Sequence, residues 1–89
     1  MIDLNMIDLK NETPKNQKLE VWSGKYNGYV VEIYQKRILL SRIPKWYYRL
    51  KRDNFIYDSY SENEYGYQEK VSASGAAYQH ICNFKKDVS

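Results

Sequence analysis

Basic and acidic side chains occupy separate stretches of this 89-residue chain, although its net charge is only +3. Every charged residue between positions 36 and 52 is basic, and every charged residue between positions 53 and 69 is acidic. Clustered ammonium and guanidinium groups bind phosphates, and an aromatic ring among them can stack on a base or a sugar. The basic stretch therefore predicts a nucleic-acid-binding surface. Its expected binding residues are Arg37, Arg42, Lys45, Tyr47, Arg49, Lys51 and Arg52.

The same charges also have a purely structural explanation. If a strand carrying Arg49 and Lys51 pairs with a strand carrying Asp58, opposite charges meet across the hairpin and partly neutralise one another. The sequence leaves both explanations open.

The acidic stretch predicts a second kind of surface. It combines carboxylates with tyrosines, and tyrosine is enriched at the energetic centres of protein–protein interfaces. The alternative function is therefore binding to a protein partner. The residues expected to carry it are Tyr57, Asp58, Tyr60, Glu62, Glu64 and Tyr65.

The residue types needed for catalysis are sparse. The chain has one histidine, His80, and one cysteine, Cys82, which cannot build a four-ligand zinc site by themselves. It contains neither a glycine-rich phosphate-binding loop nor a nucleophile elbow. We expect His80 to be a hydrogen-bonded helix residue and Cys82 a small apolar one. The sequence therefore predicts a binding protein without enzymatic activity, cofactor or metal.

Cysteine content and hydropathy indicate a compartment. A single cysteine excludes an internal disulfide, which suits a reducing environment. No apolar run approaches the roughly 18 residues of a membrane span, and the N-terminus lacks the pattern of a secretory signal. We expect a cytoplasmic protein without a membrane partner, located in the bacterial host cell if the chain is phage-encoded.

The binding residues depend on a strand expected over residues 46–52. Alternation places Trp46, Tyr48 and Leu50 on one face, where they can be buried. Tyr47 and Arg49 then lie on the other face together with Lys51. Further strands are expected over residues 19–23, 29–36 and 55–60, with tight turns at Asn27-Gly28 and Asp53-Asn54. The apolar residues 38–40 suggest a bulge or a loop tucked into the core.

Residues 68–84 have the periodicity of a helix. The stripe expected to be buried consists of Ala73, Ala77, Ile81 and Phe84. Gly75 lies in a second stripe, and close packing against the sheet would explain a glycine at that position. The expected fold is therefore α+β: a small antiparallel sheet of three to four strands with one C-terminal helix packed across one face.

The N-terminal segment differs in composition. It opens with a near-duplication, Met1 to Leu4 and Met6 to Leu9, which is consistent with a tandem duplication or with a second start codon at Met6. We expect residues 1–18 to be a flexible arm and residues 19–89 to be the single domain. Pairing of the apolar residues as an added edge strand is the alternative, and a self-associating edge would produce a homodimer.

Two resemblances bear on function. The residues that carry the first are Trp46 to Leu50, Gly66 and Tyr67, and then Ala73, Ala76 and Ala77. Around them, residues 28–84 resemble the arm-type DNA-binding domain at the N-terminus of phage and transposon integrases. They are also similar in outline to the DNA-binding domains of plant ethylene-response factors. The resemblance implies a sheet that enters the major groove, with Tyr47, Arg49 and Lys51 facing DNA.

The acidic residues depart from that pattern, because a DNA-binding sheet would carry cations where this chain has Asp58, Glu62 and Glu64. The second resemblance concerns chain length and composition and does not involve a motif. A short chain rich in Lys, Asn, Tyr and Ile looks like the small anti-defence proteins of phages, including anti-CRISPR proteins. That resemblance implies an inhibitor that binds a host nuclease complex through an acidic surface. The expected partner is thus nucleic acid or a protein complex that processes it.

Overall fold

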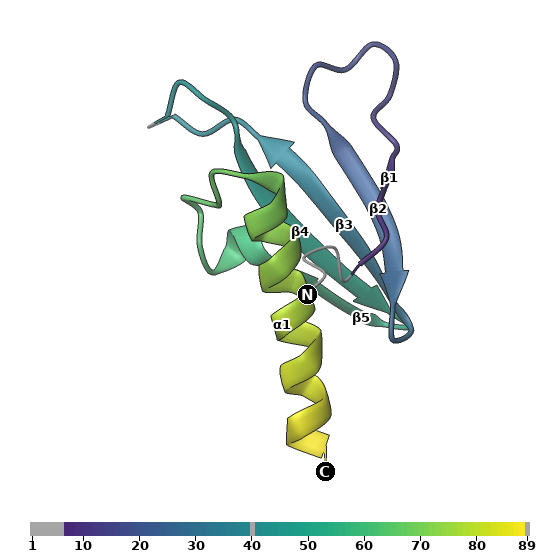
Figure 1. Ribbon diagram of the computed structural model, residues 1–89. Helices are drawn as coiled ribbons and strands as arrows, with labels where there is room; N and C mark the ends of the chain where they lie inside the picture. The colour runs from purple at the N-terminus through teal and green to yellow at the C-terminus, as the bar shows by residue number, and fades with distance from the viewer. Residues whose placement is uncertain (1–6, 40, 89) are drawn as a thin grey trace, which may run out of the picture.

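The computed structural model describes residues 7–39 and 41–88, which form an antiparallel sheet with one helix across it (Figure 1). The α+β class is confirmed, but the sheet has five strands, so the expected three to four is wrong. Each strand pairs with the next one along the chain. The elements are β1 (Lys10–Asn11), β2 (Val21–Tyr26), β3 (Tyr29–Lys36), β4 (Lys45–Arg52), β5 (Phe55–Asp58), the short 3₁₀ helix η1 (Ser59–Ser61) and α1 (Lys70–Val88).

Two tight turns set the register of the sheet. Asn27 and Gly28 connect β2 to β3 with φ values of 52° and 82°, and Asp53 begins the turn between β4 and β5 with φ of 52°. Asn, Asp and Gly tolerate this left-handed region better than other residues. Both turns lie where the sequence predicts them, and β3 has the predicted bounds.

Alternation along the central strands separates a buried face from an open one. Val31 is paired with Leu50, and Ile33 with Tyr48, on the face that α1 covers. Ala73, Ala77 and Ile81 of α1 are buried against these residues. The predicted faces of β4 and the predicted stripe of α1 are therefore confirmed. Small alanines let the helix approach the sheet closely, so the core is a single layer of side chains.

The N-terminal segment also contributes to the core. Ile7 is 2 % exposed and belongs to the same apolar cluster as Val31 and Leu50. A Cβ atom on Gly24 of β2 would clash with the carbonyl oxygen of Asp8, so the chain crosses directly over this glycine. Together with β1, these contacts tie residues 7–11 of the expected flexible arm to the sheet. Residues 1–6 lie outside the described part of the chain.

Three local expectations are corrected by the structure. Residues 37–39 and 41–44 lie outside the strands, in the connection between β3 and β4, and Leu39 is fully exposed there, so the expected bulge or core-packed loop is wrong for Leu39. Ile38 is half-buried, and residue 40 of the expected apolar run lies outside the described residues. Gly75 is exposed, and a Cβ atom added to it would have no neighbour within 4 Å. Close packing therefore does not explain this glycine. β5 ends at Asp58, because Ser59 begins η1 instead of continuing the strand.

The helix does not have the properties of a membrane span. Across residues 7–39 and 41–88, no helix is both long enough and apolar enough to cross a bilayer.

Candidate nucleic-acid interface

The face of the sheet opposite α1, called the open face below, carries most of the basic strand residues. Cross-strand register places Lys36 opposite Lys45 and Glu32 opposite Arg49 on this face. Among the strand residues that alternate onto it, six are basic and two are acidic. The basic ones are Lys10, Lys25, Lys36, Lys45, Arg49 and Lys51, and the acidic ones are Glu32 and Asp58.

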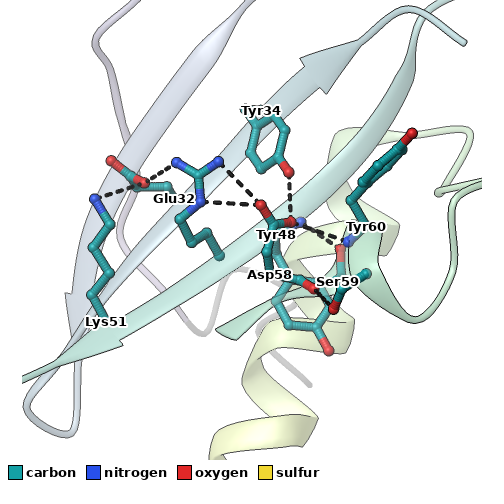
Figure 2. A network of polar contacts seen from close by, with 9 residues as sticks. Glu32, Tyr34, Tyr48, Lys51, Asp58, Ser59 and Tyr60 are labelled. Carbon is teal, nitrogen blue, oxygen red and sulfur yellow. Dashed lines mark hydrogen bonds and ion pairs between the residues drawn. The ribbon is translucent and has the colours of Figure 1, made fainter. Parts of the chain in front are cut away.

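An ion cluster occupies the centre of the open face (Figure 2). Arg49 donates from Nε and Nη2 to Oδ2 of Asp58 over 3.2 and 3.1 Å. Its Nη1 donates to Oε1 of Glu32 over 3.1 Å, and Nζ of Lys51 lies 3.3 Å from the same oxygen. Arg49 and Lys51 are thus paired with carboxylates on neighbouring strands, as the structural explanation of the charge pattern predicts. The positive charges of these two residues are thus partly neutralised within the sheet.

The carboxylate of Asp58 is held in its charged form. Its Oδ1 accepts hydrogen bonds from the phenol of Tyr34 over 2.5 Å and from the backbone N–H of Tyr60 over 3.1 Å. Burial alone would raise the pKa of the Asp58 carboxyl, but these bonds and the contact with Arg49 outweigh it. The pKa therefore lies below its ordinary value. Asp58 joins β4, β5 and η1 and is a structural residue.

Tyr47 does not present its ring to a ligand. It is completely buried, although it lies on the open face, because residues 60–66 fold over it. Its ring stacks on Tyr34 at 5.7 Å between centroids and meets the edge of Tyr60 at 5.3 Å. The Tyr47 hydroxyl donates to the backbone carbonyl of Glu64. The expectation that Tyr47 stacks on a base is therefore wrong for this conformation.

The end of the β3–β4 hairpin holds the most concentrated positive charge. Lys36 and Lys45 are directly opposed across the two strands, an arrangement that is destabilising for like charges. Arg37 and Arg42 lie in the loop between them, and both are exposed. Among the described residues, the ion pairs of the basic stretch involve Arg49 and Lys51 but none of these four cations. An anionic ligand would relieve the repulsion at this end.

Arg52 belongs to the other side of the molecule. It alternates onto the face that α1 covers, and its guanidinium lies over the ring of Tyr29, 5.3 Å from the centroid. The expected nucleic-acid-binding set therefore divides into three parts. Arg37, Arg42 and Lys45 gather at the hairpin end, Arg49 and Lys51 join the ion cluster, and Tyr47 and Arg52 lie apart from both.

Three lysines of the open face, Lys10, Lys25 and Lys36, are absent from the expected set. Lys10 pairs with Ser23 in register, and Lys25 pairs with Val30. For Lys25 and Lys36, the alternation of β2 and β3 was a usable signal, because it assigns each residue to a face. β1 has only two residues, and they carry no such pattern.

The expected protein-binding set is also divided. Tyr57 lies on the helix side, with its ring 4.4 Å from that of His80. Asp58 is held in the ion cluster, and Lys36 lies over the ring of Tyr60, with its Nζ 4.8 Å from the centroid. Only the loop residues remain exposed together, namely Glu62, Glu64 and Tyr65.

His80 and Cys82, the histidine and the cysteine of the chain, both lie on α1. Nδ1 of His80 lies 2.8 Å from the phenol oxygen of Tyr48, as expected for a hydrogen-bonded helix histidine. Cys82 is half-buried, with a free thiol. Within the described part of the chain, no three His, Cys, Asp or Glu side chains are grouped so that they could hold a metal ion.

Comparison with known proteins adds no further constraint. No protein-family model matches the chain, and no curated protein or solved structure is significantly similar to it.

Proposed function

We propose that this protein binds nucleic acid through the open face of its sheet, mainly by contacts with phosphate groups. The supporting observation is the distribution of charge, with six basic and two acidic strand residues on the face opposite α1. Two of the six cations are paired internally, so the outer ones carry the interaction. These are Lys10, Lys25, Lys36 and Lys45, with Arg37 and Arg42 at the hairpin end.

The aromatic rings of this face favour phosphate contacts over base stacking. Arg49 lies over the ring of Tyr34, 4.9 Å from its centroid, while Tyr47 stacks on the same ring. Lys36 lies over Tyr60, whose ring also packs against Tyr47. Because these rings already have partners within the chain, a base would have to displace them. Binding to phosphates requires no such displacement, so we expect binding that depends weakly on sequence and strongly on salt.

The test is a fluorescence-anisotropy titration of a labelled 20-base-pair duplex at several salt concentrations. Lys36→Gln with Lys45→Gln should weaken binding about tenfold at low salt and reduce the slope of log K against log salt by about two. Arg52→Gln with Lys70→Gln is the matched control, because it removes the same charge from the helix side. Equal losses in both double variants, or no binding by the unmodified protein at low salt, would reject the proposal.

The acidic loop supports a second candidate function, inhibition of a host nuclease complex by direct binding. Tyr65 is 63 % exposed and has exposed Glu62 and Glu64 as neighbours in the chain. Large exposed aromatics flanked by charge are typical of binding hot spots. A plaque assay in cells with an active CRISPR system tests this function. Full protection of the phage after these three residues are changed to Ala would exclude the acidic loop as the site that binds the nuclease complex.

The formation of a homodimer stays a prediction, which sedimentation velocity can check.

A further inference from the structure

β5 is the last strand of the sheet, and its only neighbour in the strand order is β4. A two-residue turn joins the two strands, so Arg52 and Phe55 form the first hydrogen-bonded pair of the ladder. Hydrogen-bonded and non-hydrogen-bonded pairs alternate in an antiparallel ladder, so Tyr57 also directs its backbone N–H and carbonyl toward β4. Ile56 and Asp58 therefore direct their backbone groups away from the sheet.

Contacts at the end of β5 agree with this pattern. The backbone N–H of Tyr48 points toward the β5 side of β4 and donates to the hydroxyl of Ser59 over 3.0 Å. The outward carbonyl of Asp58 accepts a hydrogen bond from the hydroxyl of Ser61 over 2.7 Å. Among the residues that the structure describes, the backbone hydrogen bonds formed outside the strands and helices do not involve Ile56. Ile56 thus offers one donor and one acceptor at the edge of the sheet.

The side chains at this edge are apolar. Ile56 is 67 % exposed and lies opposite Lys51 on the open face. Phe55 is 42 % exposed on the helix side, where its ring meets that of Phe84 at 5.6 Å between centroids. Outward backbone groups beside exposed apolar side chains are a template for pairing with a further strand. The opposite edge is better protected, because β1 has only two residues and one of them is Lys10.

The sequence of β5 is complementary to itself. In a second copy that runs antiparallel about Ile56, the two Ile56 residues would exchange two backbone hydrogen bonds. Phe55 of each copy would lie opposite Tyr57 of the other in non-hydrogen-bonded pairs, where side chains approach most closely. Asn54 would lie opposite Asp58, so no like charges would be opposed. An unrelated strand would have to match the same aromatic and aliphatic positions, which favours a second copy as the partner.

We propose that two copies of this chain pair through β5 about a two-fold axis at Ile56, which joins their sheets into one continuous sheet. The axis is perpendicular to the sheet, so both open faces lie on one side and both helices on the other. The ring of Tyr57 from one copy would then extend the aromatic contact between Phe55 and Phe84 of the other. The interface is small, so we expect a dimer in the weak, reversible class.

The dimer does not depend on the proposed function, but it would extend it. Lys51 lies opposite Ile56 in each copy, so the two Lys51 side chains would flank the axis across the paired β5 strands. Three strand spacings separate them, which is about 14 Å. One nucleic acid could therefore contact the basic residues of both copies. A ligand that holds two copies side by side also raises their effective concentration and so favours the pairing.

The experiment measures the sedimentation velocity of the full chain from about 1 μM to 1 mM, the range in which weak dimers dissociate. The unmodified protein should change from monomer to dimer across this range. Ile56→Lys should remain monomeric, because two like charges would be directly opposed in the pair. Val71→Lys is the matched control, since it adds the same charge to an exposed apolar residue of α1, and it should dimerise like the unmodified protein.

A cross-linking experiment tests the register. Ile56→Cys, in a chain that also carries Cys82→Ser, should form an intermolecular disulfide on mild oxidation. The Cα atoms of a hydrogen-bonded pair are about 5.5 Å apart, which is within reach of a disulfide. Val71→Cys in the same background is the control and should cross-link far less. Circular dichroism checks that each variant is folded.

The outcomes separate this inference from the proposed function. A monomer at every concentration, or cross-linking of the Ile56→Cys chain at the level of the control, would overturn the inference. A dimer that persists in the Ile56→Lys variant would overturn β5 as its surface. A dimer that Ile56→Lys abolishes would support the inference even if the protein does not bind duplex DNA, a result that would overturn the proposed function alone.

Discussion

The phenol oxygen of Tyr48 lies 2.8 Å from Nδ1 of His80, and this contact links the middle of β4 to α1. The imidazole also packs against the rings of Tyr57 and Phe84, at 4.4 and 4.7 Å between centroids. A charged imidazole is poorly solvated among these rings. Burial therefore lowers the pKa of His80, while the charge of Glu62 opposes this effect in part.

The lowered pKa of His80 predicts that acid weakens the fold. The unfolded chain has an ordinary histidine and takes up a proton first as the pH falls below about 6.5. The stability that neutral His80 provides is thus fully present above that pH and is lost as the pH falls through the folded-state pKa. Urea unfolding between pH 8 and pH 5 should show this loss, and His80→Gln should reduce it. A free energy of unfolding that stays flat down to pH 5 would contradict the assignment.

Asp58 predicts a second loss of stability at lower pH. Its pKa is lowered in the folded state, so the stability it provides is present above about pH 4 and is lost as the pH falls through the folded-state value. Asp58→Asn should cost about 1–3 kcal/mol at pH 7, because Arg49 and Tyr34 lose a charged acceptor. The cost should shrink below pH 3. Glu62→Gln is the control, since that carboxylate is exposed, and it should change stability little.

Gly66 is predicted to be intolerant of any side chain. Its φ is 70°, and an added Cβ atom would lie 2.7 Å from the ring of Tyr47 and 2.9 Å from the carbonyl oxygen of Trp46. Gly66→Ala should destabilise the protein by about 2–4 kcal/mol through backbone strain and overpacking. Gly75→Ala is the matched control. It should stabilise α1 by about 0.5–1 kcal/mol, because the position is exposed and unobstructed. Denaturant melts of the two variants should therefore shift in opposite directions.

Tyr47→Phe should separate folding from binding. The substitution removes the hydrogen bond to the carbonyl of Glu64 and should cost about 1 kcal/mol of stability in urea unfolding. Affinity for duplex DNA should stay unchanged, because the ring is buried and its hydroxyl faces the protein. A loss of affinity without a loss of stability would show that Tyr47 belongs to the binding surface.

Periodicity was sufficient to predict the elements that build the core. The alternation of Trp46, Tyr48 and Leu50 and the helical spacing of Ala73 and Ala77 reflect burial on one face, which acts locally on the sequence. The contact between Arg49 and Asp58 was also predictable, because a two-residue turn sets which residues face one another. These features depend on neighbours a few residues away in the chain or directly across a hairpin.

Features that depend on distant segments were not predictable. Tyr47 alternates onto the same face as Arg49, but residues from a later loop bury it. β1 adds to the sheet through the backbone of Lys10 and Asn11, whose side chains carry no strand pattern. The residues of the candidate interface differ from the expected set for the same reason. The sequence identified the charges, whereas pairing with Glu32 and Asp58 determined which of them are already neutralised.

The sequential order of the five strands has a consequence for how the chain folds. Every hydrogen-bonded strand pair joins neighbours in the sequence, and two of the connections are only two residues long. Hairpins of this kind close in microseconds, because little loop entropy is lost. Docking of α1 onto β4 and β3 brings together segments that are far apart in the chain. We therefore expect the sheet to form early as a loosely ordered meander, and arrival of the helix to be the step that limits the folding rate.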